Sequence, residues 1–189
     1  MKLSKYFSLG ELTKSQTAVR LGIKNNPSNS HIFQLRALCV NVLDPVRERF
    51  GVPFSPSSGF RNLDLNTRLG GAKNSQHTFG QAADIEVPGI SNYTLARWIQ
   101  KNLDYDQLIL ESYVHPDPSS GWVHVSYSTS DNRKESLSYA DGTYASGIHL
   151  VVYDTSHSSD NASPSNRSGG VMFSILNFLR DILSHGGKK

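Results

Sequence analysis

The sequence contains a single cysteine, Cys39, among 189 residues. One thiol cannot form an internal disulfide, so the chain is not a small secreted domain held together by a disulfide framework. Cys39 lies within a helical pattern of apolar residues, where a free cysteine behaves as a small hydrophobic side chain. We therefore expect it in the core, without a redox role.

The amino terminus lacks an apolar run of the length found in signal peptides. Lys2, Lys5, Glu11 and Lys14 interrupt the first residues, and only short apolar stretches lie between them. The sequence therefore predicts a protein made in the cytoplasm and not exported by the signal-peptide route.

A strong charge of one sign is also missing. The formal net charge is +3 at pH 7, and the basic residues are not gathered into a stripe. Proteins that bind nucleic acid usually carry such a stripe, so we expect no nucleic-acid partner. The mild positive charge is compatible with attraction to an anionic surface.

Chemically active side chains are densest between Arg61 and Asp84. His77 and Asp84 are seven positions apart, with small residues between them that favour a tight turn into the strand 82–87. An imidazole and a carboxylate are both good ligands for Zn²⁺, which in catalytic sites takes three protein ligands and keeps a position for water. Strand alternation in 121–127 places His124 on one face with Trp122 and Ser126, so His124 is the candidate third ligand. Taken alone, His124 would more often be structural; the company of His77 and Asp84 favours the ligand.

The pattern Ser75-x-His77-x-x-Gly80-x-Ala82-x-Asp84, followed by Trp122-Val123-His124, resembles the zinc D-alanyl-D-alanine carboxypeptidase family. That family includes L-alanyl-D-glutamate endopeptidases and phage lysins, and the resemblance covers residues 5 to about 130. It implies a Zn²⁺ ion bound by His77, Asp84 and His124. It also implies an α+β fold in which helices pack on a small antiparallel sheet, as in the Hedgehog signalling domain.

The resemblance further implies a substrate, the stem peptides of peptidoglycan, and a residue that holds the substrate carboxylate, Arg61. A planar guanidinium suits this role because it binds a carboxylate through two parallel hydrogen bonds. A surface salt bridge is the alternative for Arg61. Ser75, within the motif, and Trp122, beside His124, are expected to contact the substrate.

One position departs from the pattern. Many family members have an acidic residue three positions before the last histidine, and here that residue is Gly121. We expect 106–111 to form a strand that pairs antiparallel with 121–127, which places Glu111 roughly level with His124 and makes it the candidate general base. His115 and Asp117, in the connecting loop, are the alternatives, since either could polarise the substrate carbonyl.

Apolar spacing predicts helices over about 5–14, 31–50 and 91–102, with Pro45 kinking the second, and a final strand or hairpin within 139–153. We expect a catalytic domain over 1–154 and a flexible Ser-rich linker over 155–170. A C-terminal amphipathic helix and basic tail should occupy 171–189. The apolar segment 171–183 is too short to cross a bilayer, so it should lie on a membrane surface, dock onto a partner or self-associate. Packing back onto the catalytic domain is the alternative.

Three functions remain in order of preference. The first is a zinc metallopeptidase that hydrolyses D-amino-acid-containing peptide bonds of peptidoglycan. We expect it to be a phage-encoded lysin, because a chain without a signal peptide reaches the wall through a membrane hole, a virion or cell lysis. The second is a catalytically weak zinc-containing wall-binding or virion module, suggested by Gly121. The third is a targeting protein in which the C-terminal helix matters most.

Overall fold

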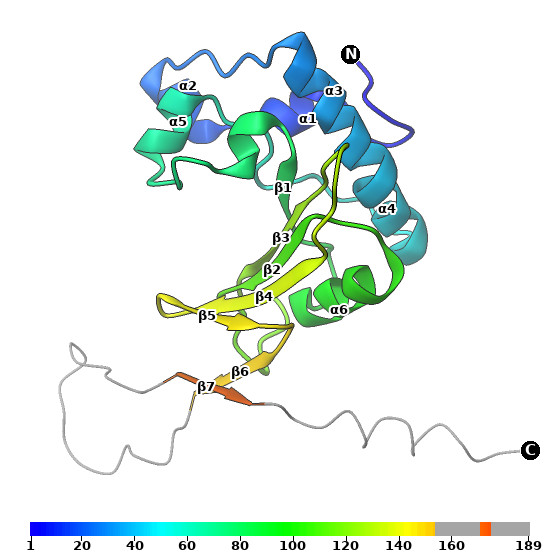
Figure 1. The fold of residues 1–189 in the computed structure, drawn as a ribbon, viewed down its shortest axis with the longest axis vertical. Helices are drawn as coiled ribbons and strands as arrows, with labels where there is room; N and C mark the ends of the chain where they lie inside the picture. Colours follow the sequence, from blue (N-terminus) through cyan, green and yellow to red (C-terminus); the bar gives the residue numbers. More distant parts are fainter. Residues whose placement is uncertain (154–170, 175–189) are drawn as a thin grey trace, which may run out of the picture.

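The computed structural model describes residues 1–153 and 171–174. Its centre is a five-stranded sheet with helices above it and on one side (Figure 1). The strands are β1 (Ala82–Ile85), β2 (Gln107–Glu111), β3 (Trp122–Ser126), β4 (Glu135–Ala140) and β5 (Thr143–Ser146), in the order β1-β3-β2-β4-β5. The predicted α+β class is confirmed.

The sheet is mixed, whereas we expected it to be antiparallel. The β1–β3, β2–β3 and β4–β5 pairs are antiparallel, but β2 and β4 run parallel. The reason lies in the order of the strands. Because β1 already occupies the outer edge of β3, the chain leaving β3 joins the free edge of β2, and there it runs in the same direction as β2.

The long predicted helix is continuous but changes its winding. It consists of α3 (Asn29–Leu38), a π-helical turn η1 (Cys39–Leu43) and α4 (Asp44–Phe50). Pro45 lies in the first turn of α4. Proline has no N–H to donate to the preceding turn, and a wider turn just before it accommodates the missing bond. Cys39 is buried in the core, as predicted.

Shorter helices complete the described chain: α1 (Leu9–Thr13), α2 (Gln16–Leu21), α5 (Leu63–Arg68), a 3-10 turn η2 (Gln76–Phe79) and α6 (Asn92–Asn102). Ser8 and Ser91 cap α1 and α6, since each side chain accepts a hydrogen bond from a backbone N–H of the first turn. The helices predicted near 5–14 and 91–102 are therefore confirmed with slightly different bounds.

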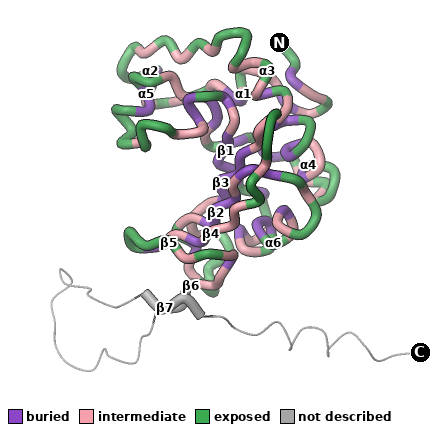
Figure 2. The backbone as a smooth tube through the Cα atoms, in the orientation of Figure 1, coloured by how far each residue is buried: buried purple, intermediate pink, exposed green. Residues whose placement is uncertain are grey.

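The two faces of the sheet differ in what covers them. Helix α6 packs against β2 and β3, and buried residues concentrate where the helices meet the sheet (Figure 2). The strands contribute to this core alternate residues that share one face: Ala83, Ile85, Leu108, Leu110, Val123 and Val125. The residues between them, including Asp84, Glu111 and His124, belong to the other face.

At the carboxyl end, β6 (Leu150–Tyr153) pairs antiparallel with β7 (Val171–Ser174). Strand β6 confirms the final strand predicted before residue 153. Within the helix predicted over 171–183, the structure describes only residues 171–174, and these form the strand β7, so the prediction is wrong there. A short apolar run can form either a helix or a strand, and pairing with β6 favours the strand. The remainder of that helix, the linker over 155–170 and the basic tail lie outside the described residues. Among the helices of the described ranges, none has the length and apolar character needed to cross a membrane.

Candidate metal centre

Three elements bring His77, Asp84 and His124 together. Asp84 in β1 lies directly opposite His124 in the antiparallel β1–β3 pair. His77 comes from η2, and Gly80 ends that turn with a φ of 72°. A Cβ at Gly80 would lie 2.8 Å from the His31 carbonyl oxygen, so both the backbone angle and the space favour glycine there. The glycine in the motif thus allows His77 to turn back onto the strand that carries Asp84.

The three side chains are buried and their ligand atoms converge. Asp84 Oδ1 lies 3.2 Å from His77 Nε2 and 3.0 Å from His124 Nδ1, and one ligand atom from each residue lies within 4.8 Å of the others. Four ligands about 2.0–2.1 Å from a tetrahedral ion are separated by about 3.3 Å. The observed separations are therefore close to those of a zinc site.

The protonation of His77 also fits a cation. His77 Nδ1 lies 2.7 Å from the carbonyl oxygen of Gly59, which can only accept, so this nitrogen carries the hydrogen. The lone pair of the neutral ring is then at Nε2, facing a carboxylate oxygen. Two acceptors face each other stably only with a proton or a cation between them. A carbonyl partner behind a ligating histidine is the usual way of fixing its tautomer.

Asp84 stays ionised in this setting. Burial by itself raises the pKa of Asp84, but when a proton lies between the carboxylate and the imidazole rings, hydrogen bonds and charge interactions with His124 and His77 outweigh burial and hold the pKa well below its usual range. A deprotonated carboxylate is the form that binds metal. The donor set, two imidazole nitrogens and one carboxylate, is one that zinc accepts.

Arg61 lies beside the triad rather than on the surface. Its NH2 group donates to Asp84 Oδ2 at 2.7 Å, and its Nε donates to Ser58 Oγ at 2.8 Å. The contact leaves Asp84 Oδ1 for the histidines and orients the carboxylate, as outer-shell partners of metal ligands do. Arg61 also lines the cleft described below, so its predicted contact with substrate remains a prediction.

Glu111 lies on the same face of the sheet as His124 but one step further along. The register pairs Glu111 with Trp122 and Ile109 with His124. The antiparallel pairing of β2 and β3 was predicted correctly, but Glu111 lies opposite Trp122, two residues from the predicted level of His124. Burial raises the pKa of Glu111, as does the charge of Asp84, against the lowering effects of His124, Arg61 and a hydrogen bond from Trp122.

Gly121 has a structural reason to be glycine. Its φ is 63°, and a Cβ there would overlap the carbonyl oxygen of Glu111. The chain therefore has no room for a side chain at this position. The backbone of Glu111 lies against Gly121, and the side chain of Glu111, in the strand that pairs with β3, lines the cleft.

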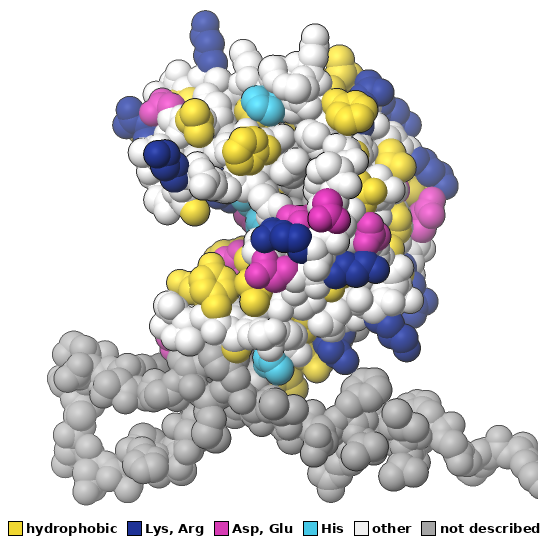
Figure 3. Space-filling view, viewed as in Figure 1, with side chains coloured by type: hydrophobic (Ala, Val, Ile, Leu, Met, Phe, Trp, Pro, Cys, Tyr) yellow, Lys and Arg dark blue, Asp and Glu magenta, His cyan; other side chains and the backbone are white. Residues whose placement is uncertain are grey.

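A cleft of about 500 Å³ contains the triad (Figure 3). One wall is the loop that runs from Gly70 to Gln76 and includes Ser75. The other is the open face of the sheet, with Glu111 and Trp122. His115 and Asp117 do not line it: both are exposed in the loop between β2 and β3, and Asp117 accepts hydrogen bonds from the backbone N–H and hydroxyl of Ser119.

Further residues that the sequence interpretation did not single out line the cleft, among them Gln76, Gln107, Arg133, Tyr139 and Tyr144. Gln76 stands next to His77 in the motif, so its position was a usable signal. Tyr139 lies opposite Glu111 across the parallel β2–β4 pair, and Tyr144 lies opposite Tyr139. These two depend on the strand order, which no local pattern reports.

Comparison with known proteins agrees with this geometry. The family described as Peptidase M15 matches residues 5–126, which is more than half of the chain and includes all three residues of the triad. No curated protein matches the sequence significantly.

Proposed function

Because the chain belongs to the Peptidase M15 family, a family of zinc peptidases related to the D-Ala-D-Ala carboxypeptidases, we propose that it is a zinc-dependent peptidase that hydrolyses peptide bonds in the stem peptides of bacterial peptidoglycan. The observation that carries the proposal is the buried His77–Asp84–His124 triad inside a cleft wide enough for a peptide. The residues that would hold zinc are those three. A bound zinc ion supplies Lewis-acid chemistry, polarising a carbonyl and lowering the pKa of water towards about 7.

Glu111 is the group placed to accept a proton from the attacking water. It lies on the face that carries His124, lines the same cleft, and has a pKa raised mainly by burial. A base with a raised pKa holds a proton more firmly and can return it to the leaving amine. A hydrogen bond from Trp122 acts against burial and lowers this pKa in part.

Substrate binding falls to the remaining lining residues. Arg61 orients Asp84 and offers its outer N–H groups to a substrate carboxylate. Ser75 and Trp122 stand on opposite walls of the cleft, where they would contact the peptide from two sides.

The proposal is tested by digesting purified peptidoglycan with the wild-type protein and with His77→Ala, each with and without a chelator, and identifying released fragments by mass spectrometry. We expect cleavage by the wild type only, lost with the chelator and restored by zinc, since the variant lacks a ligand. The fragment masses identify the bond. A zinc-loaded wild type that binds peptidoglycan without releasing fragments would contradict the peptidase and support a wall-binding module.

A further inference from the structure

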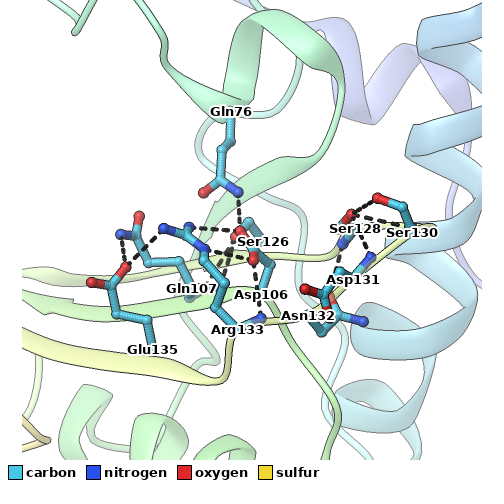
Figure 4. Close-up of polar contacts among 10 residues, drawn as sticks. All are labelled: Gln76, Asp106, Gln107, Ser126, Ser128, Ser130, Asp131, Asn132, Arg133 and Glu135. Carbon is cyan, nitrogen blue, oxygen red and sulfur yellow. Dashed lines mark hydrogen bonds and ion pairs between the residues drawn. The ribbon is translucent and has the colours of Figure 1, made fainter.

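The side chain of Gln76 is held from the opposite side of the cleft. Its Nε2 donates a hydrogen bond to Asp106 Oδ2 (Figure 4). Gln76 begins η2, the turn that carries His77, while Asp106 immediately precedes β2. This bond therefore joins the motif turn to the sheet, at a point away from the metal ligands.

Asp106 is itself firmly anchored. Arg133 donates to it three times: from the backbone N at 3.2 Å and Nε at 2.8 Å to Oδ1, and from NH2 at 2.7 Å to Oδ2. Hydrogen bonds from Arg133 lower the pKa of Asp106 in spite of its burial. Asp106 is buried, whereas the Arg133 side chain is 52% exposed. The carboxylate thus stays ionised and can only accept hydrogen bonds.

Hydrogen bonds within the turn that precedes Arg133 hold this residue in position. Ser128 N donates to Asn132 Oδ1 at 2.9 Å, and the N–H groups of Ser130 and Asp131 donate to Ser128 Oγ. Asn132 Nδ2 reaches back to Asp104 at 2.9 Å. Together these bonds close the connection between β3 and β4 on itself, so the position of Arg133 is set independently of any substrate (Figure 4).

An acceptor-only partner decides which way the Gln76 amide faces. An amide carries two N–H donors on one side and a carbonyl acceptor on the other. Since Asp106 can only accept, the nitrogen must face it, and the carbonyl oxygen points away from Asp106 (Figure 4). Gln76 lines the cleft, and no hydrogen bond from the described part of the chain reaches its Oε1.

We propose that Gln76 is a substrate-binding residue whose Oε1, oriented by the Asp106–Arg133 pair, accepts a hydrogen bond from a backbone N–H of the bound peptide. Asp106 is then a positioning residue that acts through Gln76. The inference rests on the proposed peptidase function for the identity of the ligand, but the orientation of the amide does not depend on it. An amide locked by the protein costs little entropy when the substrate binds.

The experiment compares wild type with Gln76→Met, which keeps the length of the side chain and removes both polar groups. The probes are a synthetic stem peptide and a series of analogues in which each amide in turn is N-methylated. Affinities are measured by calorimetry in zinc-loaded protein carrying Glu111→Gln to prevent turnover, and kcat/KM is measured without that change. Zinc affinity is measured separately by competition with a chelator. Gln16→Met, the same substitution at an exposed position of α2 outside the cleft, is the matched control.

We expect Gln76→Met to weaken peptide binding roughly three- to tenfold, the loss of one neutral hydrogen bond, with zinc affinity and the control unchanged. One N-methylated analogue should bind the wild type more weakly than the unmethylated peptide does, by the same factor. The same analogue should bind Gln76→Met as well as the unmethylated peptide does. Asp106→Asn should reproduce the peptide defect, because an amide at 106 no longer dictates which side of Gln76 faces the cleft.

Two results would overturn the inference. If the losses of affinity caused by Gln76→Met and by N-methylation add for every analogue, Gln76 accepts no hydrogen bond from a substrate N–H. A drop in zinc affinity in Gln76→Met would mean that Gln76 serves to hold His77 in position and does not bind substrate. If the wild type binds the peptide but does not cleave it, the proposed function fails instead, and the binding measurements still decide the role of Gln76.

Discussion

The two faces of the central sheet carry residues that alternate along the same strands yet perform opposite tasks. In β2, Leu110 is 1% exposed and packs in the core, while the next residue, Glu111, faces the cleft. In β1, Asp84 stands between Ala83 and Ile85, both fully buried against the helices. The period of two in a strand makes this division possible, because each neighbour points to the other side. Stability and chemistry are thus separated by a single position in the chain.

The sharpest way to test the separation is Glu111→Gln. A general base contributes about 10²- to 10⁴-fold to rate, so kcat for peptide cleavage should fall by roughly that factor. Stability should not fall. Because burial raises the folded pKa of Glu111, ionising this side chain costs more in the folded protein than in the unfolded chain, and a neutral glutamine removes that cost. Kinetics and thermal unfolding of the same preparation check both statements; an unfolded or fully active variant would refute the division.

Leu110→Ala is the opposite change at the adjacent residue. Removing a buried leucine side chain from a core costs about 2–5 kcal/mol, so the unfolding midpoint should drop clearly in a denaturant titration. The variant that remains folded should bind zinc like the wild type, since Leu110 does not line the cleft. Loss of zinc affinity at a temperature where the variant is folded would show that the faces are coupled.

Gly121→Ala tests a position at which the backbone lies directly against that of Glu111. A residue held at positive φ costs on the order of 1–3 kcal/mol, and the added Cβ would press on the backbone of Glu111. We expect lower stability and lower activity together, unlike either preceding variant. An alanine variant with wild-type unfolding and kinetics would mean that this turn tolerates a side chain.

The smallest expected effect concerns pH and the Asp106–Arg133 pair. Hydrogen bonds from Arg133 hold the folded pKa of Asp106 below the usual range of an aspartate. A lowered folded pKa contributes stability above the unfolded pKa, and this contribution is lost as pH falls below about 4. Stability measured against pH should therefore decline less steeply in that range for Asp106→Asn than for wild type. Identical slopes would mean that the pair contributes nothing measurable.

Local pattern predicted the residues of the triad and the helices near 31–50 and 91–102 well, but it missed α2 and α5 and predicted the cleft less well. His77, Gly80 and Asp84 lie within one turn and one strand, so their spacing alone limits where the side chains can go. His124 required only the assumption that a second strand pairs with the first. Glu111 was predicted on the correct face but two residues out of register, because a long loop fixes the register of a strand less closely than a tight turn does.

Three features could be predicted from the order of the residues alone. They are the side-chain types suited to zinc, the glycine that permits the turn before Asp84, and the alternation that divides core residues from cleft residues. These depend on interactions over a few neighbouring positions. The tertiary structure alone decided that β4 joins β2 in parallel, which brings Tyr139 and Tyr144 to the cleft, and that Arg133 anchors Asp106 beneath Gln76. Such contacts join residues far apart in the chain, and they form only because the edge of β3 was already occupied and the next strand had to pair elsewhere.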